Sequence, residues 1–268
     1  MFYGCQPPKI DLRDYKLNPE VASAAQLPDE FALEERMKIK NQMTVSSCVA
    51  HATSSILEYH DKGQRELSTN FIYGIQREVC GREAPGMYLA DACKIVNKYG
   101  DMIEDDCSGN NEVPKSCDIA EEAFNDAQKL ERAKHFKVTR YFNCKSNTDI
   151  KYAIMNYGPV LGSIKWYDKY KVKNGTISFD QTSDYGYHAI VIYGWNKDGF
   201  LCQNSWGALW GNKGRFILPY EYKIRESKGL VDYVNEKDIV IPKTDAFLDV
   251  MYKVLNWIFN LVKKFTNK

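Results

Sequence analysis

The pattern of apolar and polar positions divides the chain into a helical first half and a strand-rich second half. Apolar residues at helical spacing predict helices over residues 47–62, 88–98 and 118–134. From about residue 150, short apolar segments bounded by glycine and asparagine predict strands. The clearest strand covers residues 189–193, and a tight turn leads from it into a second strand that begins at Phe200. Helices followed by strands indicate an α+β fold with two lobes.

The two ends of the chain differ from the predicted main domain at residues 27–240. Residues 1–26 are polar, are broken by Pro7 and Pro8, and show no clear periodicity, so we interpret them as an N-terminal extension. Two hypotheses are open for this extension. It lies in or beside the active site and hinders substrate entry, or it is a disordered tail.

Residues 241–268 are predicted to contain an amphipathic helix over 245–265, which Thr244 can cap. Its polar residues fall within an arc of about 100°, and its remaining positions are apolar, which is a broader apolar face than one supporting surface requires. Polar residues at every third or fourth position argue against a membrane span. Two hypotheses are open for this helix. It packs in a deep groove on its own domain, or a second surface covers it through self-association, another protein or a membrane interface.

Composition excludes several classes of function. The 268 residues are 44% hydrophobic and carry a net charge of +1, which suits one large domain or two lobes without a basic tract for nucleic acid. The first residues lack a signal-peptide pattern and no apolar run is long enough to cross a bilayer, so we expect a cytoplasmic protein with reduced thiols. The eight cysteines form no C-x-x-C pair, and we predict neither a metal site nor a cofactor.

Cys48 is the candidate nucleophile. It lies in the first turn of the predicted 47–62 helix, after Ser46 and Ser47, where the partial positive charge of a helix N-terminus favours a thiolate. The alternative is an inert core thiol. Gln42, six residues earlier, offers a side-chain amide for the negative charge that acyl transfer builds on a carbonyl oxygen.

A candidate base and its orienting partner lie far along the chain. His188 begins the 189–193 strand, and Asn204 follows the next strand, so the intervening turn brings the two side chains near one another. A cysteine with a histidine and an asparagine about 130–150 residues downstream is typical of thiol proteases. His51 is the rival base, since it lies three residues after Cys48 on the same helical face, but no orienting residue lies near it in the sequence.

Three segments resemble the papain family of cysteine proteases. They are Asn41–Ala50 around the nucleophile, Tyr187–Ile190 around the histidine, and Asn204–Gly211 with both of its tryptophans. Leu27–Phe31 resembles the start of the mature enzyme, and the match extends over roughly residues 27–238. The resemblance implies a papain-like two-lobed α+β fold, with a helical N-terminal lobe, a β-barrel-like C-terminal lobe and the active-site cleft between them.

The nucleophile segment departs from the usual family pattern. Val45, Ser46-Ser47 and Val49 replace the Cys-Gly-Ser that commonly precedes the nucleophile and the Trp that follows it. The missing cysteine removes a common disulfide. Together with the short extension and Arg13-Asp14-Tyr15, this resembles short-extension prokaryotic or phage-type members.

The resemblance implies a role for each matching residue. Cys48 attacks the peptide carbonyl, His188 acts as base, Asn204 orients the imidazole, and Gln42 with the Cys48 amide forms the oxyanion hole. Trp206 shields the pair of His188 and Asn204 from water. The residues expected to bind substrate, in a pocket with apolar walls, are Gly86, Met87, Tyr88, Ser163, Tyr187, Ala189 and Trp206.

These assignments predict a cysteine endopeptidase that acts on peptides or proteins. Two alternatives use the same fold. One is a catalytically silent peptide-binding module, and the other is a peptide ligase that uses the same residues.

Overall fold

A computed structural model describes the chain over residues 4–7, 15–81, 85–109, 117–231 and 239–240. The helices are α1 (Pro19–Ala24), α2 (Cys48–His60), α3 (Thr69–Gly74), α4 (Gln76–Cys80), α5 (Leu89–Lys98), α6 (Cys117–Asn125), α7 (Ala127–Ala133) and α8 (Asn147–Tyr157), with a 3-10 turn at Lys134–Phe136. The strands are β1 (Tyr15–Leu17), β2 (Phe31–Ala32), β3 (Arg140–Asn143), β4 (Val160–Tyr167), β5 (Tyr170–Lys173), β6 (Thr176–Phe179), β7 (Tyr185–Asn196), β8 (Gly199–Gln203), β9 (Arg215–Leu218), β10 (Ile224–Val231) and β11 (Ile239–Val240).

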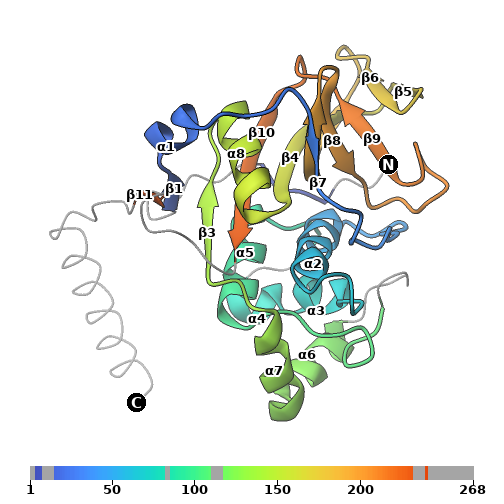
Figure 1. The fold of residues 1–268 in the computed structure, drawn as a ribbon. Coiled ribbons are helices and arrows are strands. Elements are labelled where there is room, and N and C mark those ends of the chain that lie inside the picture. Colours follow the sequence, from blue (N-terminus) through green and yellow to red (C-terminus); the bar gives the residue numbers. More distant parts are fainter. Residues whose placement is uncertain (1–3, 8–14, 82–84, 110–116, 232–238, 241–268) are drawn as a thin grey trace, which may run out of the picture.

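The strands of these described residues form one sheet, in the order β11-β1-β3-β10-β4-β7-β8-β9-β6-β5, with β2 added to β7. Its centre is antiparallel, and β7 lies between β4 and β8. Helices α2 to α7 gather on one side of the molecule and the sheet on the other (Figure 1). This arrangement confirms the predicted α+β fold.

Two hydrophobic cores lie on opposite faces of β7. Because side chains alternate along a strand, Ala189 and Val191 face the helical core around α2, whereas Ile190 and Ile192 face the core enclosed by the sheet and α8. The first core joins α2, α3 and α5, and it includes Cys48. The N-terminal end of α2 therefore lies against the strand that carries His188.

The predicted helices are confirmed with one correction. Residues 47–62 and 88–98 form α2 and α5, but residues 118–134 form two helices rather than one. The break falls at Asp126, whose carboxylate accepts hydrogen bonds from the backbone N–H groups of Gln128 and Lys129 and so caps a new helix.

Part of the predicted N-terminal extension is regular. Residues 15–17 form β1, which pairs with β3 and β11, and Asn18 caps the short helix α1. The sequence analysis also missed α8, which begins with a capping box between Ser146 and Asp149.

The predicted helix over 245–265 lies outside the described residues. Within the described part of the chain, no helix combines the length and apolar character that a membrane crossing requires.

Candidate active site

Cys48 is the first residue of α2, and its thiol is fully buried. Its Sγ accepts a hydrogen bond from the backbone N–H of Ala189 at 3.4 Å, which links the helix to β7. Burial raises the pKa of this thiol to about 11, although the backbone N–H groups of Ala189 and Gly4 act against that rise. Ser47 occupies the N-cap position but makes no capping hydrogen bond, because its Oγ lies 3.3 Å from His51 Nδ1.

A buried ion pair fixes the segment that carries Gln42. Lys40 Nζ lies 2.8 Å from Glu58 Oε1, and both side chains are almost fully enclosed. Gln42 itself is buried, its amide donates to the Val45 carbonyl at 2.8 Å, and its Oε1 accepts from Ser205 Oγ at 2.6 Å. These contacts join the segment before Cys48 to the segment after Asn204.

The turn between β7 and β8 brings His188 and Asn204 together, as the sequence predicted. His188 Nε2 donates to Asn204 Oδ1 at 2.7 Å, and the same oxygen accepts from the backbone N–H of Ser205. An amide oxygen only accepts, so the proton lies on Nε2 and the lone pair lies on Nδ1. Among the described residues, His188 Nδ1 has no hydrogen-bond partner, which leaves it available to take a proton.

Aromatic rings enclose the imidazole. Trp206 lies 4.8 Å from the ring centre of His188, as expected, and Trp166 lies at 5.1 Å. Sequence reasoning missed Trp166, since its position inside β4 gives no local signal of proximity to the site. Burial lowers the pKa of His188 to about 4, and the hydrogen bond that the ring donates to Asn204 opposes this shift.

The chain's own N-terminal residues cover the nucleophile. Cys5 donates from its backbone to the Tyr187 carbonyl at 3.2 Å, and Gln6 donates to the Met87 carbonyl at 2.9 Å. Met87 in turn donates to the Gly4 carbonyl at 2.8 Å. Residues 4–6 therefore lie between the predicted substrate-binding segments 86–88 and 187–189, and Cys5 forms isolated β-bridges with Met87 and Tyr187.

Two glycines allow this close approach. A Cβ on Gly4 would lie 2.1 Å from the Ser46 carbonyl oxygen, so no other residue fits there without displacement. Gly86 has φ +84°, and a Cβ there would lie 2.9 Å from the Gly4 carbonyl oxygen.

The structure brings most of the predicted substrate-binding residues to the segment of residues 4–6. Met87 and Tyr187 bond to its backbone, and Ser163 Oγ lies 3.2 Å from Cys5 Sγ. Tyr88 follows Met87 as the N-cap residue of α5, and Ala189 contacts Cys48.

His51 is not placed to act as the base. Its Nδ1 faces the Ser47 carbonyl oxygen at 3.0 Å and its side chain is buried behind the helix terminus. Among the described residues, no group of three or more His, Cys, Asp or Glu side chains is placed to hold a metal ion.

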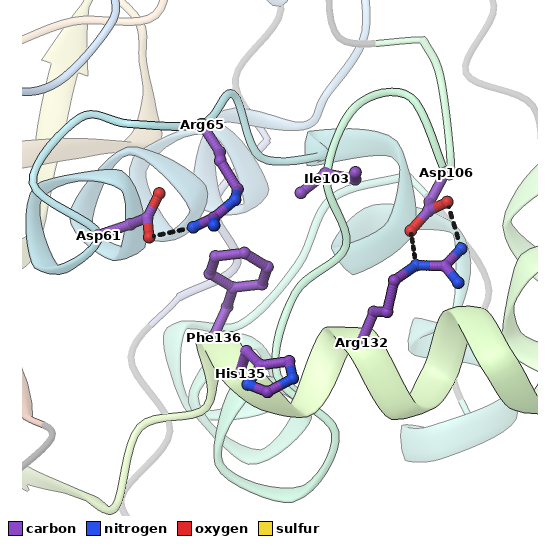
Figure 2. Close-up of a pocket in the computed structure, with 7 residues that line it drawn as sticks. All are labelled: Asp61, Arg65, Ile103, Asp106, Arg132, His135 and Phe136. Atoms are coloured by element: carbon purple, nitrogen blue, oxygen red, sulfur yellow. Dashed lines mark hydrogen bonds and ion pairs between the residues drawn. The ribbon is translucent and has the colours of Figure 1, made fainter.

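A separate surface pocket of about 350 Å³ lies at the C-terminal end of α2 (Figure 2). Its two guanidinium groups are already paired, Arg65 with Asp61 at 2.8 Å and Arg132 with Asp106 at 2.6 Å. None of the predicted site residues lines this pocket.

Cys48, His188 and Asn204 are thus buried together where the helices meet the sheet. The family model for "Papain family cysteine protease" matches residues 27–230, and the chain belongs to that family. It is 27% identical over 227 residues to a cathepsin B-like cysteine proteinase 3 from Caenorhabditis elegans, with 72% of this chain and 61% of the relative covered. It is also 27% identical over 208 residues to a gut-specific cysteine proteinase from the same organism, with 67% and 63% covered. The chain thus spans less than two thirds of the length of these relatives.

Solved structures show the same fold. Xylellain, a cysteine protease from Xylella fastidiosa, superposes with a TM-score of 0.68 at 22% identity, with 87% of this chain and 97% of that chain covered. A procathepsin B from Trypanosoma congolense gives a TM-score of 0.65 at 16% identity, with 87% of each chain covered.

Proposed function

We propose that the chain is a cysteine endopeptidase in which Cys48 forms the acyl-enzyme. The observation that carries this proposal is the 2.7 Å hydrogen bond from His188 Nε2 to Asn204 Oδ1, which leaves Nδ1 as the basic atom. Cys48 supplies the thiol at the N-terminus of a 13-residue helix. Membership of the papain family supports the same reaction.

The reaction follows from these positions. Cys48 gives its proton to His188 Nδ1, and its sulfur forms a bond to the peptide carbonyl carbon. Gln42 and the Cys48 backbone N–H stabilise the resulting oxyanion. His188 then protonates the departing amine as the C–N bond breaks, and water hydrolyses the thioester with His188 as base.

Treatment with an epoxysuccinyl inhibitor followed by mass spectrometry tests the proposal. One adduct on Cys48, together with cleavage of a peptide library, supports the enzyme. A chain that forms no adduct even after residues 4–6 are displaced would instead be a silent peptide-binding module. Ligation is distinguished by adding an amine acceptor and measuring the ratio of ligated to hydrolysed product.

We also propose that residues 4–6 hold the enzyme inactive. A cleavable peptide must present a carbonyl carbon to the sulfur, but the Gly4 carbonyl oxygen is bound to Met87 instead. The Gly4 backbone lowers the pKa of the Cys48 thiol and therefore acts as a donor to it. The segment thus excludes substrate while presenting an N–H group, which Cys48 cannot attack.

The side chain of Cys5 indicates which residues select the substrate. It is buried against Ser163, and we propose that the residue of a bound peptide nearest the scissile bond on this side enters the same space. Gly86, Met87 and Tyr187 would then bind the peptide backbone, since they already bind that of residues 4–6.

Two proposals concern the wider setting. The structure describes Cys5, Cys48, Cys107, Cys144 and Cys202 as free thiols, which supports a reducing, cytoplasmic location. The broad apolar pattern of residues 245–265 supports a second covering surface, with self-association the simplest form. Deleting residues 242–268 and comparing molecular mass and liposome binding with the full chain tests the latter.

A further inference from the structure

Large apolar side chains are exposed at four positions in the part of the chain that the structure describes: Met43, Tyr185, Leu209 and Tyr220. The first three lie in the segments that carry the proposed catalytic residues Gln42, His188 and Asn204. Single exposed apolar side chains are common on proteins, but three around one site indicate a surface that another molecule covers. Tyr185 packs against the rings of Tyr167 and Tyr187, so the exposure of Met43 and Leu209 is what needs a reason.

Met43 is held in an unfavourable backbone conformation. Its φ of +52° lies in the left-handed region, which a long side chain rarely adopts and which glycine adopts freely. The Val45 N–H donates to the Gln42 carbonyl at 3.0 Å and closes the turn around Met43, and Asn41 Oδ1 accepts from the Met43 N–H at 2.9 Å. The side chain is 48% exposed, so packing contributes little that would offset this strain. A strained, exposed apolar residue next to a catalytic position indicates a contact with another molecule.

Leu209 is fully exposed in a turn that neighbouring contacts hold in place. The Trp210 N–H donates to the Gly207 carbonyl at 3.3 Å, and the Gly207 N–H donates to the Lys40 carbonyl at 3.0 Å. The ring of Trp210 lies 5.3 Å from the ring of Trp206, in an edge-to-face contact. The turn therefore presents an apolar side chain to solvent, in the same loop as Trp206.

The chain's own N-terminal segment leaves Met43 and Leu209 uncovered. Residues 4–6 bond to the backbone of Met87 and of Tyr187, and Met87 is fully buried in this arrangement. Met43 and Leu209 are exposed in the same arrangement. The part of a substrate whose place residues 4–6 take is therefore not the part that would contact Met43 and Leu209.

The proposed reaction indicates which part of the substrate lies on their side. His188 protonates the departing amine, so the departing part of the peptide begins at His188. Trp206 lies 4.8 Å from His188, and Leu209 follows Trp206 in the same loop. Met43 directly follows Gln42, which stabilises the oxyanion in the same reaction. The departing part of the peptide therefore leaves the site past the segments that carry Met43 and Leu209.

We propose that Met43 and Leu209 bind apolar side chains in the departing part of the substrate and so determine specificity on that side of the cleaved bond. The substrate class is a peptide or protein with a large apolar residue within the first three positions after that bond. An extended peptide advances about 3.3 Å per residue, so three positions reach about 10 Å from the reacting carbonyl. This inference rests on the proposed function, because only a peptide that Cys48 cleaves has a departing part.

Matched peptides test this specificity in the full chain. The peptides share one sequence up to the cleaved bond and carry leucine or serine at the first, second or third position after it. The ratio of kcat/KM for leucine to kcat/KM for serine is the quantity measured, because the fractions of folded and of open enzyme are the same for both peptides and cancel. We expect a ratio of about ten at one of the three positions. A ratio near one at all three positions overturns the inference.

Met43→Gly separates a role in specificity from a role in the fold. Glycine removes the side chain and relieves the positive φ, so the midpoint of thermal unfolding should not fall while the leucine-to-serine ratio falls by about threefold or more. A side chain kept only for stability would give the opposite pair of results. Lys62→Gly is the matched control, because Lys62 has φ +58° and lies beyond the end of α2 that is opposite Cys48. This control should leave the ratio unchanged.

Leu209→Ser tests the second residue. Its side chain is fully exposed, so the variant should fold as the wild type does and should also lower the ratio. Tyr220→Ser is its control, since Tyr220 is the exposed apolar residue outside the catalytic segments, and it should leave the ratio unchanged. The inference is overturned if Met43→Gly and Leu209→Ser both keep the wild-type ratio. A wild-type chain that cleaves no peptide and forms no Cys48 adduct overturns the proposed function, and this inference with it.

Discussion

Cys5 Sγ lies 3.2 Å from Ser163 Oγ, although the two residues are 158 positions apart. This contact places a side chain from the beginning of the chain against a residue predicted to select the substrate. Because Gly4 lies beside Cys48 at the same time, residues 4–6 cover both the proposed nucleophile and residues predicted to bind substrate. Single substitutions in this segment can therefore test the closed arrangement.

Gly4→Ala should open the site. The new Cβ would lie 2.1 Å from the Ser46 carbonyl oxygen, and backbone cannot move aside as a flexible side chain would. Overpacking of this kind costs about 1–3 kcal/mol, which corresponds to an increase of about 5- to 150-fold in the open population. The measurement is the rate at which an epoxysuccinyl inhibitor modifies Cys48, followed by mass spectrometry.

Gly81→Ala is the matched control for this experiment. Its added methyl group meets no atom within 4 Å, and its φ of +64° gives this variant a backbone strain that Gly4→Ala does not have. The idea that residues 4–6 inhibit the enzyme is wrong if both variants react with the inhibitor at the wild-type rate.

Acidification should also open the site. In the closed arrangement, burial lowers the pKa of His188 to about 4, whereas a hydrated histidine titrates near about 6.5. An open state that admits water to His188 binds a proton in this interval that the closed state does not. The closed state therefore has its full stability above about pH 6.5 and loses it as the pH falls toward about 4. The equilibrium constant between the closed and open states changes by up to about tenfold for each pH unit in this interval.

Hydrogen exchange measures this opening. The Gln6 amide is protected while it donates to Met87, so its protection factor should fall between pH 7 and pH 5 after correction for intrinsic exchange. The Leu161 amide, in the centre of β4, provides a reference that should not change. Equal protection of Gln6 at both pH values would contradict the prediction.

The sequence predicted those parts of the site that local patterns encode. A helix that begins near Ser47 places Cys48 in a first turn, and a tight turn after the 189–193 strand makes His188 and Asn204 neighbours. Both relationships depend on residues close together in the chain, and the structure has them as expected.

The features that the sequence did not predict depend on contacts between distant residues or on helix capping. The pairing of residues 4–6 with residues 86–87 joins segments about 80 positions apart, and no periodicity marks such short partners. Trp166 reaches His188 only because β4 pairs with β7 in one register. The break at Asp126 arises because a carboxylate there binds backbone N–H groups more favourably than it continues a helix. Helical spacing alone places His51 on the same face as Cys48. In the structure its Nδ1 instead forms a hydrogen bond with the Ser47 carbonyl oxygen.

Asn204→Ala should weaken catalysis without abolishing it. The variant leaves His188 Nε2 without its acceptor, although Trp206 and Trp166 still confine the ring. A buried hydrogen bond to a group that becomes charged contributes about 1.5–3 kcal/mol, so kcat should fall about 10- to 150-fold. Steady-state kinetics per titrated site measures this. Complete loss of activity with Cys48 still reactive would mean that Asn204 does more than orient the imidazole.

Cys48→Ala should abolish hydrolysis and leave the fold intact. In the proposed reaction the Cys48 thiolate forms the acyl-enzyme, and alanine fits the space that the buried side chain occupies. The expected result is no cleavage of a peptide library and no inhibitor adduct, with a thermal unfolding curve close to that of the wild type. Cleavage at the wild-type rate would show that another residue is the nucleophile.

The thiols of the purified protein should be free and should react in an order that burial determines. Among the cysteines whose side chains the structure describes, Cys80 is partly buried and the others are buried, so Cys80 should be alkylated first of these under native conditions. Burial raises the pKa of Cys144 and of Cys202 well above the ordinary value, so these two should react only as the protein unfolds. Mass spectrometry after timed alkylation gives the order. Thiol counting in denaturant without reductant should then find most of the eight cysteines free, and three disulfides in freshly purified protein would contradict a reducing location.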